Sequence, residues 1–134
     1  MVRVAARRKE ANMSASQPSN RERNGYLETI GRKSGQARET EIWYAVAPGV
    51  IVILSGYNND KDWVKNFQAN PRVRFRIGSD WFSGTMRIVD PSEPLEHEAR
   101  RLLSAKYYNY DLSSSDELPN EWSRTGSIMA IDLD

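Results

Sequence analysis

The sequence contains no cysteine and only one histidine. Without cysteine the chain can form no disulfide, thiolate nucleophile, iron–sulfur cluster or thiolate zinc site. The single histidine, His97, lies between two glutamates in a polar stretch of helical pattern, so we expect it to face solvent. A Ser-His-Asp triad and a multi-histidine metal site are therefore excluded, and no metal site is predicted.

A large charge of one sign and a long apolar run are missing as well. The 19 basic and 18 acidic residues leave a formal net charge of +1, which argues against sequence-independent binding of nucleic acid by the whole surface. No apolar run approaches the roughly 20 residues that a membrane span needs, and the start of the chain lacks the apolar core of a signal peptide. We therefore expect a cytoplasmic protein with no stable membrane insertion and no nucleic-acid partner.

The length of 134 residues fits one domain. Residues 1–24 carry several arginines among small and polar residues and have almost no apolar content. Such a segment buries too little surface to offset its ordering entropy. Residues 1–24 are therefore predicted to be a mobile basic tail, in which Met13 is an alternative start, and residues 25–134 to be a single domain.

Residues 25–134 are dominated by strand patterns. The uninterrupted apolar run Val50–Leu54 predicts a strand buried on both faces, and we expect it to be the central strand. The run Arg72–Ile77 alternates apolar residues with arginines and predicts one apolar and one cationic face. Strands are predicted at Tyr26–Ile30, Glu39–Val46, Val50–Leu54, Arg72–Ile77, Trp81–Val89 and Ser127–Leu133.

Helical spacing appears in two places, around Trp63–Phe67 and from Leu95 to Tyr107, and a polar loop is predicted over Ser113–Arg124. A chain this short with so many strand edges favours a closed or partly closed sheet. We predict a mainly β fold with flanking helices (α+β), built as a compact, partly open barrel of about six antiparallel strands and two or three helices.

The stretch Gly31–Arg38 has the composition of a loop that wraps an anion. Two glycines enclose Arg32, Lys33 and Ser34, and Arg38 follows. Glycine permits positive φ and close approach of backbone N–H groups, arginine offers a planar fork, lysine a point charge and serine a short donor. A basic hairpin turn on the surface is the alternative interpretation, and the spacing is not that of a P-loop.

Four motifs in order make the chain similar to a known family. The run Gly31-Arg32-Lys33-Ser34-Gly35-x-x-Arg38 precedes Ile42-Trp43-Tyr44, Leu54-Ser55-Gly56 and Asp62-Trp63-Val64-x-Asn66-x-x-Ala69-Asn70-Pro71-x-Val73. Over roughly residues 26–77 this order resembles the deazaflavin-dependent nitroreductase family. The resemblance implies a split β-barrel, related more distantly to FMN-binding split barrels, and it implies binding of coenzyme F420, a deazaflavin with a phosphate and an oligoglutamate tail.

The resemblance also implies where the cofactor binds. In the family, the glycine-bounded basic loop and the arginine after it meet the anionic part of the cofactor. The end of the strand Val50–Leu54 and the start of the next helix border the ring, and aromatic residues near the C-terminus form the substrate pocket. Carried over to this chain, the cofactor-binding residues are Arg32, Lys33, Ser34, Gly35, Arg38, Trp43, Ser55, Gly56 and Trp63, and the acceptor-side candidates are Ser55, Tyr107, Tyr108 and Tyr110.

No set of side chains for acid–base or nucleophilic catalysis at neutral pH is present, so a cofactor must supply the chemistry. The chain is expected to hold an acceptor against one ring face, to exclude water with flat aromatic walls, and to stabilise charge with a hydroxyl. The hypothesis is an F420-dependent oxidoreductase that transfers hydride to a nitro compound, a quinone or an enone.

Three alternatives remain open: an FMN-binding split-barrel oxidoreductase, a flavin or deazaflavin carrier without turnover, and a nucleic-acid-binding barrel. The last would use Arg72, Arg74 and Arg76 as a platform for single strands. A homodimer is also expected, because the cationic strand face and the last strand both need cover.

Overall fold

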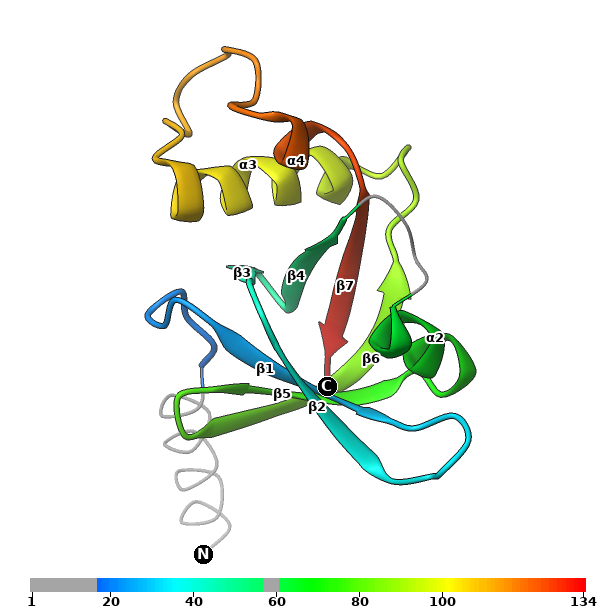
Figure 1. Cartoon of the computed structure of the whole chain (residues 1–134). Helices are drawn as coiled ribbons and strands as arrows, with labels where there is room; N and C mark the ends of the chain where they lie inside the picture. Colours follow the sequence, from blue (N-terminus) through cyan, green and yellow to red (C-terminus); the bar gives the residue numbers. More distant parts are fainter. Residues whose placement is uncertain (1–16, 57–60) are drawn as a thin grey trace, which may run out of the picture.

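The structure is a computed structural model that describes residues 17–56 and 61–134. Within these residues seven strands form one sheet in the order β2-β1-β5-β6-β7-β4-β3, and all neighbouring strands are antiparallel. The sheet curls into a half-barrel (Figure 1), which confirms the predicted fold class. The strands are β1 (Gly25–Ile30), β2 (Ala37–Ile42), β3 (Ala45–Ala47), β4 (Val50–Ser55), β5 (Arg72–Ile77), β6 (Asp80–Ile88) and β7 (Ser127–Leu133).

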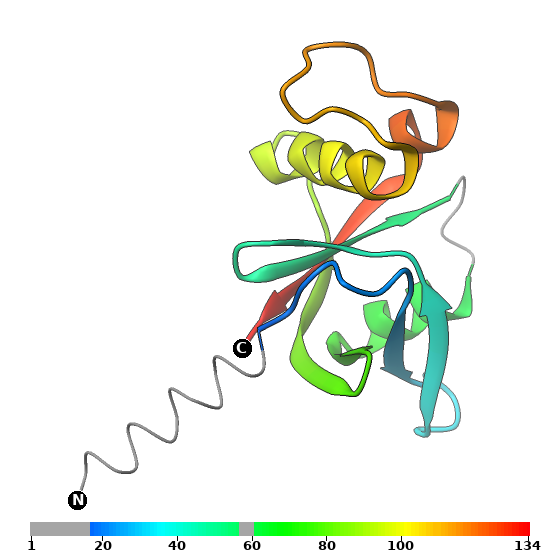
Figure 2. The same cartoon turned by 90° about the vertical axis from the view of Figure 1, so that its left-hand side faces the viewer.

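Three helices flank the sheet in the described part of the chain: α2 (Asp62–Ala69), α3 (Pro94–Tyr108) and α4 (Glu121–Arg124). Figures 1 and 2 show α3 and α4 together at one end of the molecule, where α3 packs on β3, β4 and β7, while α2 lies apart from them against β1 and β6. His97 is exposed on α3, as predicted. None of these helices is long and apolar enough to cross a membrane.

The short helix α4 lies inside the stretch 113–124, so the prediction of an uninterrupted loop there was wrong. Its first turn is closed by a reciprocal cap. The Asn120 side chain accepts a hydrogen bond from the Ser123 N–H at 2.9 Å, and the Asn120 N–H donates to the Ser123 hydroxyl at 3.2 Å. Such capping boxes stabilise helix starts whose hydrophobic pattern is too short to detect.

Strand β4 is buried on both faces, as its apolar run predicts. Ile51 and Ile53 point into the barrel core, whereas Val52 and Leu54 join a second core beneath α3. The expectation that β4 is the central strand is wrong, because β6 is the fourth of the seven strands. A helix packed on the outer face gives an off-centre strand the same two-sided burial as a central one.

The predicted strand Glu39–Val46 is two strands, β2 and β3, separated at Trp43 and Tyr44. The two pieces pair with opposite ends of the sheet, β2 with β1 and β3 with β4. At the break, side chains of α3 form the hydrogen bonds to the backbone that a neighbouring strand would otherwise form. The Tyr44 N–H donates to the Tyr107 hydroxyl at 3.0 Å, and the Tyr44 carbonyl accepts from the Lys106 ammonium at 3.0 Å. This split raises the strand number from the predicted six to seven.

Residues 17–24, the last part of the predicted tail, contact the barrel. The Tyr44 hydroxyl donates to the Ser19 carbonyl at 2.7 Å, and the Tyr107 hydroxyl donates to the Arg23 carbonyl at 2.6 Å. Arg21 binds Asp80 at 2.8 Å. The rest of the predicted tail, with Met13, lies outside the described residues.

The cationic face of β5 exists as predicted, but its charge is compensated. Arg72 pairs with Asp134 at 2.7 Å, Arg74 with Glu28 at 2.8 Å and Arg76 with Glu39 at 3.3 Å. The Arg74 guanidinium also lies over the Trp81 ring, 4.1 Å from its centroid. These cations are therefore held by acidic and aromatic neighbours on the same sheet face.

Candidate functional site

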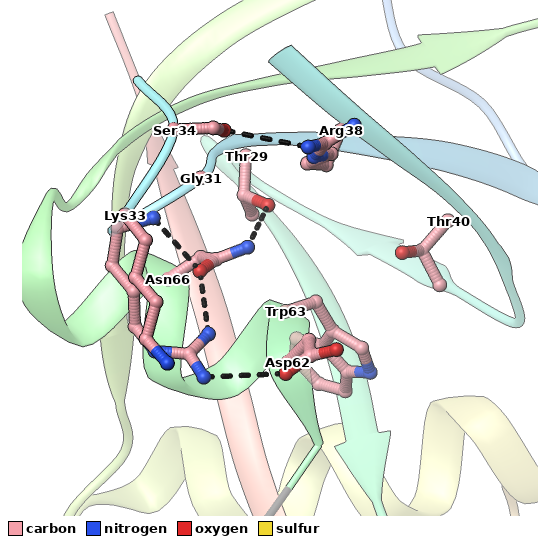
Figure 3. Close-up of a pocket in the computed structure, with 10 residues that line it drawn as sticks. Thr29, Gly31, Lys33, Ser34, Arg38, Thr40, Asp62, Trp63 and Asn66 are labelled. Atoms are coloured by element: carbon pink, nitrogen blue, oxygen red, sulfur yellow. Dashed lines mark hydrogen bonds and ion pairs between the residues drawn. The ribbon is translucent and has the colours of Figure 1, made fainter. Parts of the chain in front are cut away.

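A cleft of about 450 Å³ lies between the β1–β2 turn and helix α2. This volume is within the range of small-molecule sites. Figure 3 shows Arg38 and Thr40 of β2 on one side and Asp62 and Trp63 of α2 on the other. The cleft is lined by Thr29, Gly31, Arg32, Lys33, Ser34, Arg38, Thr40, Asp62, Trp63 and Asn66.

The turn itself is closed by its glycines. The Gly31 N–H donates to the Gln36 carbonyl at 2.8 Å, and the Gly35 N–H donates to the Gly31 carbonyl at 2.8 Å. Gly35 has a φ of +71°, a conformation that favours glycine. Both glycine N–H groups therefore serve the turn and not a ligand, and Gly35, which was predicted to bind the cofactor, is absent from the lining.

Lys33 and Arg38 are the cations of the turn that remain available. Both are exposed and line the cleft, and no acidic group in residues 17–56 and 61–134 lies within ion-pair distance of either. Among the described residues, Arg38 donates a hydrogen bond to the Ser34 hydroxyl alone, at 3.4 Å. With Arg32, the described residues that line the cleft include three cations against the one carboxylate of Asp62, a donor set that fits phosphate or carboxylate groups.

Helix α2 supplies the opposite wall. Trp63 is only 6% exposed and stacks on Phe67, with ring centroids 6.3 Å apart and an interplanar angle of 24°. Asn66 lies one helical turn further and is 4% exposed. The wall therefore combines a rigid apolar ring with a buried amide, which suits the mixed character of cofactor clefts.

Five of the residues predicted from the sequence meet in this cleft: Arg32, Lys33, Ser34, Arg38 and Trp63. Sequence reasoning gave no role to Thr29, Thr40, Asp62 and Asn66. The signals were present, because Thr29 pairs with Arg38 across the β1–β2 register and Thr40 shares the Arg38 face two residues on. Asp62 and Asn66 are four residues apart on one helix face, within the stretch Asp62–Val73 that carries part of the family resemblance.

Trp43 does not line the cleft. It stacks on Tyr107, with centroids 4.1 Å apart and an interplanar angle of 3°, and meets Tyr108 and Trp122 edge-on at 6.1 and 5.6 Å. The Arg23 guanidinium lies 5.2 Å from the Trp43 ring centroid. Trp43, Tyr107, Tyr108 and Trp122 thus form one aromatic cluster beside α3.

The remaining predicted residues lie in two other places. Ser55 is fully buried and ends β4, opposite Ser127 of β7. Gly56 follows it near the start of α2, since a Cβ added there would lie 3.7 Å from the Lys61 Nζ. Tyr110 follows the C-terminal end of α3, and its hydroxyl donates to the Asp116 carbonyl at 2.7 Å.

Lys106, beneath the aromatic cluster, predicts a pH dependence of stability. Burial, and then the charge of Arg23, lowers the pKa of Lys106 from its ordinary 10.5 to about 8. Between these values the unfolded chain binds more protons than the folded one, so stability should rise as the pH increases from about 8 towards 10. Urea unfolding at pH 7.5, 8.5 and 9.5 measures this rise.

The variant Lys106→Met should flatten that rise, because it removes the titrating group. Lys65→Met, which removes an exposed lysine of α2, is the matched control and should leave the rise in place. Above about pH 10 the tyrosines oppose the trend, since burial raises the pKa of Tyr107 to about 12. An equal slope in Lys106→Met and in the unmodified protein would contradict this origin.

Comparisons with known proteins agree with the resemblance noted in the sequence. A family model described as F420H(2)-dependent quinone reductase matches residues 1–120. An F420H(2)-dependent quinone reductase of Mycobacterium tuberculosis (strain H37Rv) is 28% identical over 100 residues, which cover 69% of this chain and 67% of that protein.

Solved structures share the fold. A conserved hypothetical protein of Mycobacterium tuberculosis superposes with a TM-score of 0.68 at 26% identity, over 92% of this chain and 79% of that one. An F420-H2 dependent reductase superposes with a TM-score of 0.57 at 18% identity, over 81% of this chain and 93% of that one.

Proposed function

The chain belongs to the F420H(2)-dependent quinone reductase family, and from this premise we propose that it reduces a quinone with hydride from coenzyme F420 bound at the cleft beside α2. Family membership makes the protein an oxidoreductase with F420 as its cofactor. Of the three acceptor classes predicted from the sequence, the quinone is the one that the family description favours.

One observation carries the proposed location of the cofactor. The turn Gly31–Arg38 presents Lys33 and Arg38 to the cleft without acidic partners in the described part of the chain, as the anionic portion of F420 requires. The cation pairs of the β5 face offer no comparable site, because each of those arginines already binds a carboxylate. The donor set of the cleft thus fits the cofactor.

In this proposal the bound cofactor supplies the hydride, and the chain binds the cofactor, orients it and shields it from water. Lys33, Arg38 and the Ser34 hydroxyl hold the anionic part, and the Trp63 ring forms a flat apolar wall that excludes water from one side. We place Ser55 and Gly56 toward the ring, because they end the strand that leads to α2.

The acceptor-side candidates predicted from the sequence lie outside the lining of the cleft. Tyr107 and Tyr110 keep their hydroxyls engaged with backbone carbonyls, at 2.6 Å from Arg23 and 2.7 Å from Asp116 respectively. Trp43 and Tyr108 are packed with Tyr107 in the aromatic cluster. Ser55 is fully buried at the end of β4, and we propose it and the tyrosines equally as acceptor-side candidates.

We also propose a homodimer. Trp81 is a large apolar residue that remains 37% exposed on the outer face of β6, and a second copy would give it cover. Light scattering on the purified protein should give twice the chain mass of 15.3 kDa. A mass of one chain at micromolar concentration would contradict the dimer.

A cofactor titration tests the proposed function. We expect F420 to bind with a saturable change in its visible absorption, FMN to bind much more weakly, and reduced F420 to be oxidised when a quinone is added to the complex. Tighter binding of FMN would favour the FMN-dependent alternative. Bound F420 that stays reduced with every quinone tried would favour a carrier without turnover.

A further inference from the structure

We propose that Arg32 exchanges partners when the cofactor binds: Asn66 holds it in place, and an anionic group of F420 displaces Asp62 from its guanidinium. In this role Asn66 is a positioning residue, and Asp62 is a built-in competitor that limits the affinity for anions. The inference rests on the proposed function, since it assigns roles at the same cleft.

Asn66 fixes Arg32 at both its backbone and its side chain. The Asn66 Oδ1 accepts a hydrogen bond from the Arg32 N–H at 3.1 Å and a second one from the Arg32 Nη1 at 2.9 Å. The Asn66 amide is 4% exposed, and its Nδ2 points to the Thr29 hydroxyl at 3.4 Å. Figure 3 shows Asn66 in the middle of the cleft residues, next to Thr29. A buried amide with these partners has little freedom to move.

Asp62 is held much less firmly. Its carboxylate accepts one hydrogen bond from the Arg32 Nη2 at 3.3 Å, and its side chain is 87% exposed, against 28% for Arg32. An exposed ion pair of this kind contributes little, because water and salt compete with it. Asp62 can therefore rotate into solvent at small cost and leave the Nη2 side of Arg32 to a ligand.

The two partners of Arg32 thus have opposite effects on an incoming anion. Asn66 is uncharged and leaves the guanidinium its full positive charge, whereas Asp62 offsets that charge and repels phosphate and carboxylate groups at the same opening. The ligand group that takes the place of Asp62 is an anion with paired oxygens, which the arginine fork can bind in a bidentate manner. F420 carries two kinds of group that meet this description, a phosphate and the carboxylates of its glutamate tail.

The test is a set of F420 dissociation constants measured by titration calorimetry on folded protein. Asp62→Asn should bind F420 about two- to five-fold more tightly, the size expected for an exposed charge pair. Asn66→Ala should bind it about five- to ten-fold more weakly, because one hydrogen-bond acceptor for the guanidinium is lost. Glu98→Gln, which removes the same charge from α3, is the control and should leave the constant unchanged.

Both effects should become clearly smaller in an Arg32→Met background, because the parts that act through the guanidinium are lost there. Only the Asn66 bond to the residue-32 N–H and the direct repulsion by Asp62 remain. Such a reduction is the result that a merely structural role of Asn66 would not give, because damage to the cleft would weaken binding with or without Arg32. Competition by inorganic phosphate and by glutarate, measured separately, shows which anion gains most from Asp62→Asn.

Three outcomes separate the inference from the function on which it rests. If the unmodified protein binds no F420, the proposed function fails. If it binds F420 but Asp62→Asn does not bind F420 more tightly, the proposed exchange of partners is wrong. This outcome does not depend on whether Asn66→Ala folds. If the effects of Asp62→Asn and Asn66→Ala persist at full size in the Arg32→Met background, the Arg32 guanidinium is not the group through which they act.

Discussion

Replacing Lys33 and Arg38 together by alanine should weaken F420 binding by about 2–4 kcal/mol, which is about 30- to 700-fold in Kd, because charge-assisted hydrogen bonds contribute about 1.5–3 kcal/mol each and these side chains are solvated. Both line the cleft, and neither has an acidic partner among the described residues that the substitution would leave unpaired. The fold should therefore stay intact, and absorbance titration of the folded double variant measures the loss.

A second double variant controls for net charge. Arg72→Ala with Arg74→Ala also removes two cations, but from the outer face of β5, where each is bound to a carboxylate. Its affinity for F420 should stay within about two-fold of the unmodified protein. The salt dependence of binding should become shallower only in the cleft variant. Unchanged affinity after loss of Lys33 and Arg38 would place the cofactor site elsewhere.

The strand faces could be predicted because they depend on local alternation. Val73, Phe75 and Ile77 point into the barrel core, as their spacing requires, and the arginines between them face outward. The cations of the β1–β2 turn were predictable for the same reason, since a glycine-bounded turn keeps its side chains near one another whatever the rest of the chain does.

The break at Trp43 and Tyr44 could not be predicted from local pattern. It depends on Tyr107 and Lys106, which lie more than 60 residues further along the chain and take up the backbone groups of Tyr44. The alternation of Ile42, Tyr44 and Val46 continues across the break, so the sequence pattern contains no sign of it. Long-range side-chain partners override local strand propensity here.

The cleft was only half predicted for a related reason. The turn supplies Arg32, Lys33, Ser34 and Arg38 by sequence adjacency, but the opposite wall is set by how α2 packs on β1 and β6. Trp43 was predicted to lie at the cofactor ring because of its motif, but it lies elsewhere. It stacks on Tyr107, and this contact depends on how α3 packs against the sheet. Residues brought in by helix packing need the tertiary structure to be placed.

Replacing Arg100 by methionine should destabilise the fold by about 3–5 kcal/mol, the loss typical when one partner of a buried ion pair is removed. Arg100 is 8% exposed on α3, and its guanidinium binds Glu96 at 2.6 Å. It also donates to the carbonyls of Thr125 at 2.8 Å and Gly126 at 2.9 Å, where the chain passes from α4 into β7. Methionine retains the apolar stem but leaves these acceptors and the Glu96 carboxylate without their donor.

Urea unfolding of Arg100→Met measures this loss, and Arg124→Met is its matched control. Arg124 pairs with Glu117 on the surface with its side chain 45% exposed, so its removal should cost no more than about 1 kcal/mol. Arg100→Lys should keep the charge yet recover only part of the stability, because an ammonium cannot reach Glu96, Thr125 and Gly126 with a planar fork. Equal losses in Arg100→Met and Arg124→Met would show that the contacts of Arg100 do not hold α3 to the start of β7. The contacts of Arg100 also bear on the proposed site. They hold the chain just before Ser127, the first residue of β7, and Ser127 pairs with Ser55 at the end of β4.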